Sequence, residues 1–277
     1  MRIFPILLLA ILAFPGSNAG AQAPYGSNDA AGHYLSTRGF KLYYEVYGQG
    51  EPLLLFHGNG GSIGNMGNQI TYFSQHYKVI AVDTRAHGRS KDPSDSLSFE
   101  QIVDDFNALL DSMHLDSCYV IGWSDGGIDA LLLAIRHPDK VKKMAFTGAN
   151  LWPDSTGLTP FVWKVMVETQ PEILKKPHTP ENDNQKKIFD LDFYQPHITL
   201  DQLHHISCPT LVIGGDHDVI PVRHTVLIAE NISRSYLWIV PNSGHSVPIF
   251  KKDQFNPIIY DFFTHPYRKI EGAATFQ

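Results

Sequence analysis

The sequence predicts an α/β fold in which a doubly wound, mostly parallel sheet carries helices on both faces. Short apolar runs recur along the chain without polar alternation, as expected for strands that are covered on both sides. Helical stretches lie between these runs, and this alternation is typical of the α/β class. Glycine-rich loops follow several runs directly, where α/β sheets build their sites.

The composition excludes several classes of protein. The chain has 277 residues, of which 43% are hydrophobic and 18% charged, so it is neither disordered nor collagen-like. A net charge of −6 argues against nucleic-acid binding through a broad basic surface. Two cysteines exclude a disulfide scaffold and every multi-cysteine metal module.

The first 21 residues have the features of a secretory signal peptide. Arg2 supplies a positive charge, Ile3–Phe14 is apolar apart from one proline, and Ala19–Ala21 offers a cleavage site before Gln22. A membrane anchor is the alternative, but spanning a bilayer takes about 20 apolar residues. We therefore expect an exported protein, periplasmic or extracellular, without stable membrane insertion.

Seven segments are predicted as strands. Residues 40–47 alternate and are rich in tyrosine, which indicates a half-exposed edge strand. Residues 22–36, which are rich in small and polar types, are expected to form a loose lead-in. The core strands are expected at residues 53–56, 79–82, 119–121, 144–146, 211–213 and 237–240.

Helices are expected between the strands. Ser98 and Gln101 have the spacing of a capping box and open a helix with an apolar stripe through Met113. Further helices are expected at residues 128–136, 225–231 and 257–263.

Residues 150–205 interrupt the alternation of strands and helices. The segment holds six prolines and is too long for an ordinary connection. We predict a small helical cap over the strand ends, between the strands expected at 144–146 and 211–213, within a domain of residues 22–277. Its aromatic residues argue against the alternative of a disordered insertion.

The two cysteines are predicted to be free thiols. Cys118 and Cys208 stand near the starts of strands that another strand separates, about 9–10 Å apart. That separation exceeds the roughly 7 Å that a disulfide can bridge.

The strongest functional motif is Gly122–Gly127, which follows an apolar strand and precedes a helix. A G-x-S-x-G sequence in this context forms a sharp turn that exposes the serine hydroxyl at a helix N-terminus. Ser124 is therefore the predicted nucleophile.

A serine nucleophile needs a base and an orienting carboxylate. His245 lies in a glycine-flanked loop after the last core strand and is the predicted base, with His217 as its competitor. Asp216 and Asp218 both follow the preceding strand, and their spacing does not choose between them.

The order serine, aspartate, histidine resembles the α/β-hydrolase fold family of the small-cap esterase and lactonase type, over about residues 38–265. This resemblance implies an α/β-hydrolase fold with a triad of Ser124, Asp218 and His245. It favours Asp218 because the family's acid stands three residues after a glycine, here Gly215, with Pro221 close behind.

The resemblance also implies an oxyanion hole made by the main-chain N–H groups of Asn59 and Asp125. The stretch His57–Gly61 resembles the family's H-G-x motif, in which the histidine braces the loop. The stretch Asp83–Ser90 resembles a structural D-x-R-G-x-G-x-S motif, with Ala86 in place of a glycine.

Substrate preference is less defined. The sequence around Ser124 is similar to that of the biphenyl-hydrolase-like and valacyclovir hydrolase branch, which acts on amino-acid esters. Asp125 would then pair with a substrate ammonium; the alternative is that it caps the helix and meets solvent. Candidates for the pocket lining are Trp123, Trp152, Phe161 and Trp163.

Two other enzyme classes fit less well. A dinucleotide-binding loop fails because Ile63 stands at the third glycine position. A metal hydrolase lacks the H-E-x-x-H motif, and His204 and His205 are the only adjacent histidines.

We therefore expect an exported serine hydrolase that cleaves small carboxylic esters through an acyl-enzyme, without metal or cofactor. Lactonase, C–C hydrolase and perhydrolase activities use the same triad and stay open, whereas a dehalogenase would carry aspartate in place of Ser124. A non-catalytic binding protein of this fold is the alternative from a different class. The sequence does not indicate an oligomeric state.

Overall fold

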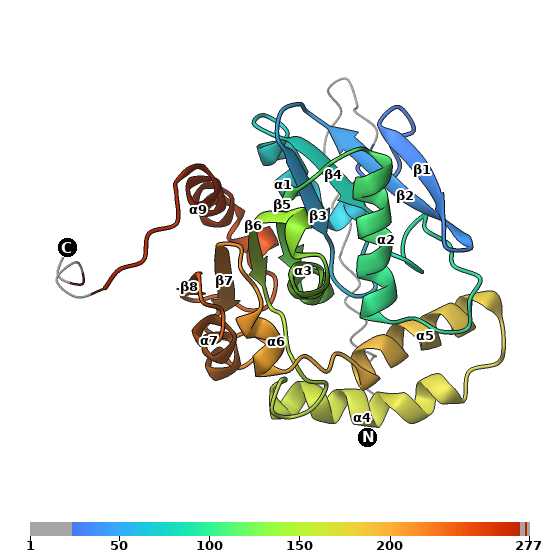
Figure 1. The fold of residues 1–277 in the computed structure, drawn as a ribbon. Helices are drawn as coiled ribbons and strands as arrows, with labels where there is room; N and C mark the ends of the chain where they lie inside the picture. The colour runs from blue at the N-terminus through green and yellow to red at the C-terminus, as the bar shows by residue number, and fades with distance from the viewer. Residues whose placement is uncertain (1–23, 272–274, 276–277) are drawn as a thin grey trace.

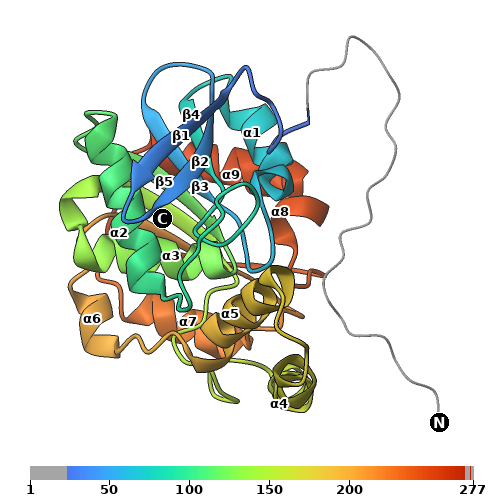
Figure 2. The same cartoon turned by 90° about the vertical axis from the view of Figure 1, so that its right-hand side faces the viewer.

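A mixed sheet runs through the centre of the protein, and helices cover both of its faces (Figures 1 and 2). The structure is a computed structural model that describes residues 24–271 and 275, so the expected signal peptide at 1–21 lies outside the described residues. The strand order is β1-β2-β4-β3-β5-β6-β7-β8, with β2 antiparallel to both neighbours and the remaining pairs parallel. The strands are β1 (Gly32–Thr37), β2 (Phe40–Tyr47), β3 (Pro52–Phe56), β4 (Lys78–Val82), β5 (Cys118–Trp123), β6 (Val141–Thr147), β7 (Thr210–Gly215) and β8 (Ser235–Val240).

All six predicted core strands are confirmed, but the prediction for the edge is wrong. β2 lies between β1 and β4, and β1 forms the edge within the segment that was expected to be a loose lead-in. β1 pairs along its whole length with β2, yet most of its side chains are exposed or half-exposed. An edge strand without a buried face leaves no hydrophobic pattern in the sequence.

One predicted helix begins where the sequence indicated, and the other three begin earlier. Ser98 and Gln101 form the predicted capping box, with each side chain accepting a hydrogen bond from the other residue's main-chain N–H. α3 and α9 start several residues before the expected positions, because their first turns contain glycine or polar residues that break the apolar stripe. The helices are α1 (Gly67–Phe73), α2 (Phe99–Ser112), α3 (Asp125–Arg136), α4 (Pro160–Leu174), α5 (Pro180–Tyr194), α6 (Leu200–His204), α7 (Val222–Glu230), α8 (Val247–Phe250) and α9 (Lys252–Thr264).

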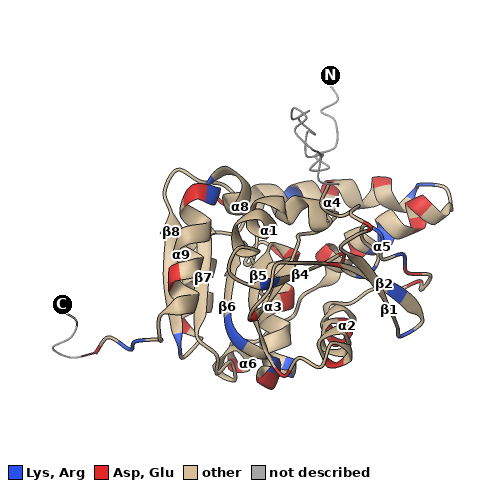
Figure 3. Cartoon of the chain, turned by 90° about the horizontal axis from the view of Figure 1, so that it is seen from above, with Lys and Arg blue, Asp and Glu red and all other residues tan. Residues whose placement is uncertain are grey.

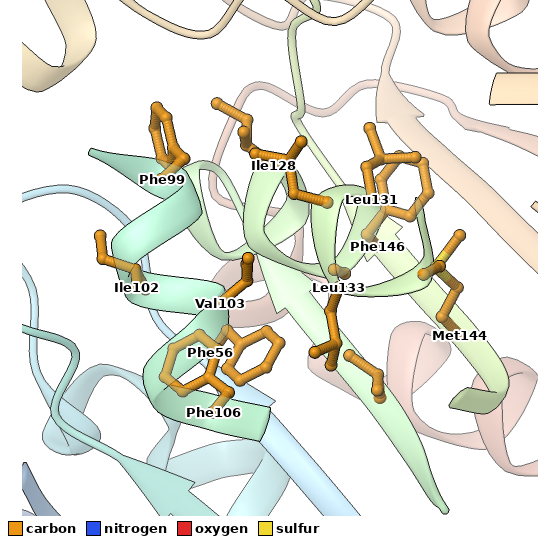
Figure 4. Packing of buried hydrophobic residues seen from close by; sticks show 14 of the residues in the cluster. Phe56, Phe99, Ile102, Val103, Phe106, Ile128, Leu131, Leu133, Met144 and Phe146 are labelled. Carbon is orange, nitrogen blue, oxygen red and sulfur yellow. The ribbon is translucent and has the colours of Figure 1, made fainter. Parts of the chain in front are cut away.

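Two hydrophobic clusters hold the layers together. One packs α2 and α3 on a face of the sheet, where the rings of Phe56 and Phe106 stack with centroids 4.1 Å apart (Figure 4). The other packs α1 and α9 on the opposite face and includes Phe73, Phe255 and Phe263. The strands between them are therefore buried on both sides, which explains their continuous apolar sequences.

The segment between β6 and β7 contains α4, α5 and α6. α4 and α5 pack on one another through Trp163 and Phe193, whose rings stack with centroids 5.3 Å apart. The segment also contacts loops that follow the sheet: the side chain of Asn184 donates to the carbonyl of Ala86, and the main-chain N–H of Thr159 donates to Val219. α4 and α5 thus lie beside the loops at the carboxyl ends of the strands (Figures 1 and 2).

Cys118 and Cys208 are both free and buried, as predicted, and β6 separates the strands beside them. Burial raises the pKa of the Cys118 thiol to about 12. Figure 3 shows acidic and basic residues scattered over the outer helices, and α2 carries acidic residues without Lys or Arg. Within residues 24–271 we find no helix with the length and apolarity needed to cross a membrane.

The stretch Asp83–Ser90 stabilises the fold through the contacts of Arg85. Arg85 donates from Nε and Nη2 to the two carboxylate oxygens of Asp105, at 2.7 and 2.9 Å, and from Nη1 to Asp92 at 3.1 Å. Its guanidinium also lies over the ring of Phe40, 3.8 Å from the centroid. Because Arg85 is only 4% exposed, these contacts hold a buried charge that joins the β4 loop to α2.

We predict that Arg85→Met lowers the free energy of unfolding by about 3–5 kcal/mol, since it leaves the buried Asp105 without its bidentate partner. The matched control is Arg136→Met, because Arg136 is 39% exposed and pairs with Asp104 at the surface. That change should cost less than about 1 kcal/mol. Urea unfolding measures both, and equal losses would contradict a structural role for the buried pair.

Candidate active site

Ser124 occupies a strained turn between β5 and α3. Its backbone has φ 58° and ψ −121°, a conformation that costs on the order of 1–3 kcal/mol for a residue with a side chain. A Cβ at position 122 would lie 2.0 Å from the carbonyl oxygen of Gly126, and one at 126 would lie 2.4 Å from that of Phe56. Glycine at both positions therefore lets α3 approach the sheet closely enough to force this turn.

The structure brings Ser124, His245 and Asp218 into one hydrogen-bonded row. Ser124 Oγ lies 2.9 Å from Nε2 of His245, and Nδ1 of the same ring lies 2.6 Å from Oδ1 of Asp218. Asp218 is buried and also accepts hydrogen bonds from the main-chain N–H groups of Gly215 and Ile220. With Nδ1–H donating to Asp218, Nε2 is left as an acceptor for the serine proton.

Asp216, which spacing alone could not separate from Asp218, has a different partner. Its carboxylate accepts hydrogen bonds from the main-chain N–H groups of Asn242 and Ser243, at 2.8 and 2.9 Å. These bonds, with one from His217, hold the pKa of Asp216 well below its usual range. Asp216 thus stabilises the loop that carries His245. His217, the alternative candidate for the base, is exposed and lies outside the hydrogen-bonded row.

The imidazole of His245 is enclosed by two further residues. Trp123 Nε1 donates to the main-chain oxygen of His245 at 2.9 Å. The Trp123 side chain is only 4% exposed and packs in the core, and its place in a substrate pocket stays a prediction. Gly148, at the end of β6, has φ 70°, and a Cβ there would lie 2.7 Å from Cε1 of His245. We had not predicted Gly148 as a site residue, although a glycine directly after a core strand is a usable signal.

The two predicted oxyanion donors lie on either side of Ser124. A Cβ at position 58 would lie 2.9 Å from that of Ser124, which shows how closely the loop carrying Asn59 approaches. Among the described residues, the main-chain N–H groups of Asn59 and Asp125 donate to no other group. His57 donates to the carbonyl of Gly58 and accepts from Thr84, and burial lowers its pKa to about 4. The neutral ring of His57 therefore stabilises the loop that carries Asn59.

Asp125 does not meet solvent, which corrects the interpretation of this residue as an exposed helix cap. Asp125 is 8% exposed, it is the first residue of α3 after the N-cap Ser124, and its carboxylate accepts from the side-chain nitrogen of Asn59 at 3.0 Å. Burial raises its pKa. Burial and the neighbouring Asp125 raise the pKa of Asp192, on α5, well above its usual range, and sequence reasoning missed this second acidic residue.

The other candidates for a pocket lining differ in their exposure. Trp152 is half-buried and donates to the carbonyl of Ile198, and Trp163 is half-buried against Phe193. Phe161 is 74% exposed on α4, which does not support its predicted place in an enclosed pocket. Within residues 24–271, no group of three or more His, Cys, Asp or Glu side chains is arranged to hold a metal ion.

Comparisons with known proteins agree on an α/β-hydrolase fold. The family model of the alpha/beta hydrolase fold matches residues 51–176. Serine hydrolase BPHL of Homo sapiens is 26% identical, over 92% of this chain and 94% of the relative. The 3-oxoadipate enol-lactonase 2 of Acinetobacter baylyi is 29% identical, over 80% of this chain and 92% of its own length. The solved structure of Est816, described as an N-acyl homoserine lactone degrading enzyme, superimposes with a TM-score of 0.69 at 26% identity, covering 83% of this chain and all of that one.

We predict that Gly148→Ala slows labelling of Ser124 by a fluorophosphonate about 10–100-fold, because the new methyl group displaces the His245 ring. Gly39→Ala is the control: Gly39 also has a positive φ, of 85°, but no atom lies within 4 Å of its added Cβ. In both variants a side chain at a positive φ lowers the free energy of unfolding by a similar amount, about 1–2 kcal/mol. Equal labelling rates in the two variants would show that Gly148 does not position the imidazole.

Proposed function

We propose that this chain, a hydrolase with the α/β-hydrolase fold, cleaves small carboxylic esters with Ser124 as nucleophile, His245 as general base and Asp218 as the orienting acid. The observation that carries the proposal is the contact of 2.9 Å between Ser124 Oγ and His245 Nε2, at a turn that exposes the hydroxyl above α3. This is the geometry that nucleophilic catalysis by serine requires.

In the first half of the reaction, Oγ of Ser124 attacks the ester carbonyl while Nε2 of His245 takes the hydroxyl proton. Asp218 stabilises the imidazolium that forms. The negative charge that develops on the carbonyl oxygen is stabilised by the N–H groups of Asn59 and Asp125, which have no other acceptor among the described residues. The tetrahedral intermediate collapses as the C–O bond breaks and His245 protonates the leaving alcohol.

In the second half, water attacks the acyl-enzyme. His245 takes a proton from the water, the acyl carbonyl again becomes an oxyanion, and Ser124 leaves with the proton returned by His245. The N-terminus of α3 favours negative charge in both intermediates, because its first main-chain N–H groups have no partners within the helix.

Lactones are a second substrate class with the same chemistry, since a lactone is a cyclic ester. The names of the enol-lactonase relative and of Est816 favour this class. In a lactonase the leaving alcohol stays attached to the acyl group until water releases the open-chain acid. C–C hydrolase and perhydrolase reactions would use the same three side chains.

Amino-acid esters are a third class, which the charge beside Ser124 favours. Asp125 and Asp192 form no ion pair with Lys or Arg in the described part of the chain. An acidic site without an internal cation suits a substrate ammonium, in a charge-assisted contact worth roughly 1.5–3 kcal/mol.

The remaining parts of the proposal concern the periphery of the domain. Residues 1–21 act as a signal peptide, and export leaves a mature chain that begins near Gln22. Residues 150–205 form a cap that limits access to Ser124, as the contacts of α5 with the loops after β3 and β4 suggest. N-terminal sequencing of the exported protein tests the first of these statements.

We predict that Ser124→Ala abolishes turnover of p-nitrophenyl esters and labelling by a fluorophosphonate, and that Asp218→Asn lowers kcat by roughly 10⁴-fold. His217→Ala is the control, because this exposed histidine lies outside the row and should retain full activity. Labelling that survives Ser124→Ala would overturn the assignment of the nucleophile.

A panel of matched esters tests the third substrate class. If Asp125 binds an ammonium, an aminoacyl ester should exceed its des-amino analogue in kcat/KM by about 10–100-fold, and Asp125→Asn should remove the advantage. An advantage that persists in Asp125→Asn, or that is absent in the native enzyme, would rule out this role while leaving ester hydrolysis intact.

A further inference from the structure

The side chain of Asn59 makes two hydrogen bonds that the proposed chemistry does not use. Its nitrogen Nδ2 donates to Oδ2 of Asp125, at the start of α3, at 3.0 Å, and to the main-chain oxygen of Ile188, on α5, at 3.2 Å. An amide nitrogen carries two N–H groups, so these two bonds use both of them. A single side chain therefore connects the loop after β3, the start of α3 and the segment inserted between β6 and β7.

The main chain of Asn59 has no other hydrogen-bonded anchor. Among the described residues, neither its N–H nor its carbonyl oxygen forms a hydrogen bond with the protein. The residues around it are held, because Nδ1 of His57 and the main-chain N–H of Gly61 both donate to the carbonyl of Gly58, at 2.8 and 3.0 Å. Gly60 has φ 63°, and no atom lies within 4 Å of a Cβ added there. The position of Asn59 within the loop therefore depends on its side chain.

Asn59 and Asp125 supply the two main-chain N–H groups that bind the oxyanion in the proposed reaction. The N–H of Asp125 belongs to the first turn of α3, whose position is set by the close approach of that helix to the sheet. The N–H of Asn59 belongs to a loop without such packing. Oxyanion donors are effective at about 2.7–3.1 Å from the oxyanion, so a small shift of one donor weakens the stabilisation. The bond between the two side chains is well placed to prevent that shift.

We propose that the side chain of Asn59 is a positioning group for the oxyanion hole, which fixes the loop donor relative to the α3 donor and connects both of them to α5. This inference rests on the proposed function, in which Asn59 and Asp125 bind the oxyanion through their main chains. The side chain itself forms no hydrogen bond with Ser124. It acts through the main-chain N–H group of its own residue.

The two acceptors explain why an amide suits this position. The ionised carboxylate of Asp125 and the carbonyl of Ile188 only accept hydrogen bonds, so the group between them must donate twice. A serine or threonine hydroxyl has one proton to donate, and an ionised carboxylate has none. Asp125 is only 8% exposed, so its carboxylate also loses a partner in a buried place when the amide is removed.

Other contacts hold α5 on the core and supply a matched control. Lys187 is 7% exposed, and its Nζ donates to Oδ2 of Asp92 at 3.0 Å. Nδ2 of Asn184 donates to the carbonyl of Ala86 at 2.9 Å. Ile188 therefore offers its carbonyl from a helix whose position is also fixed elsewhere. Asn184 makes the same kind of bond between α5 and a loop of the core, without any contact to the oxyanion loop.

Asn59→Ala removes both side-chain bonds and leaves the main-chain N–H in place. The value of kcat for a p-nitrophenyl ester should fall by about 10–100-fold with KM changed less than about threefold, because the donors stabilise the oxyanion more than the ground state. Affinity for an alkylboronic acid, which forms a tetrahedral adduct on serine, should fall in parallel. Asn184→Ala removes one bond between α5 and the core and should change kcat less than about twofold.

An exchange of donor and acceptor tests whether the bond between the two side chains is responsible. Asn59→Asp places a second carboxylate against Asp125, and kcat should fall at least as far as in Asn59→Ala. Adding Asp125→Asn restores a donor and an acceptor with their roles reversed, so kcat should rise about fivefold or more above that of Asn59→Asp alone. The bond to Ile188 is lost in both proteins, so the recovery reports the bond between positions 59 and 125.

Circular dichroism checks that each variant folds. If Asn59→Asp does not fold, Asn59→Ala and its control Asn184→Ala decide alone. Native kcat in Asn59→Ala, an equal loss in Asn184→Ala, or no recovery when Asp125→Asn is added to Asn59→Asp overturns the inference. Turnover that survives Ser124→Ala would instead refute the proposed function, so the two failures are distinguishable.

Discussion

The close approach of α3 to the sheet is the constraint on which the site depends. Gly126 lies against the carbonyl of Phe56, and Gly122 lies against that of Gly126, with no room for a side chain at either position. The chain must therefore turn sharply at Ser124, in a backbone conformation that costs free energy. The same turn raises the hydroxyl above the sheet and places the N–H of Asp125 beside it. The large buried surface of α2, α3 and the strands compensates for this strain (Figure 4).

Much of this arrangement could be predicted because its signals are local. Apolar runs gave the core strands, the spacing of Ser98 and Gln101 gave the start of α2, and glycines around a serine gave the turn at Ser124. The three residues of the row each follow a strand of one parallel sheet, so their convergence followed from the fold class. The choice of Asp218 over Asp216 did not follow from the fold class, because the main-chain N–H groups that bind Asp216 belong to the loop after β8.

What the sequence did not reveal depends on contacts between distant segments. The sequence did not predict β1, because this strand is stabilised by its pairing with β2 and buries little side-chain surface. For Trp123, the sequence did not reveal that the ring packs in the core or that its nitrogen donates to the main-chain carbonyl of His245. Asp192 belongs to no motif, and it neighbours Asp125 only because α5 packs beside the loops at this end of the sheet. Contacts of this kind leave no periodicity or spacing by which they could be recognised.

Acidic side chains near the nucleophile thus hold two kinds of position. Asp218 accepts two main-chain N–H bonds and the imidazole N–H, and Asp216 accepts two main-chain N–H bonds, so both are surrounded by donors that suit a carboxylate. Asp125 accepts from the side-chain amide of Asn59, and burial raises the pKa of both Asp125 and the neighbouring Asp192. The first pair ties together loops of the sheet, which are fixed by strand pairing. The loops that carry Ser124, His245 and Asp218 are therefore fixed by the pairing of the strands before them, whereas the loop that carries Asn59 is also bound to α5, through the hydrogen bond from the Asn59 side chain to the carbonyl of Ile188.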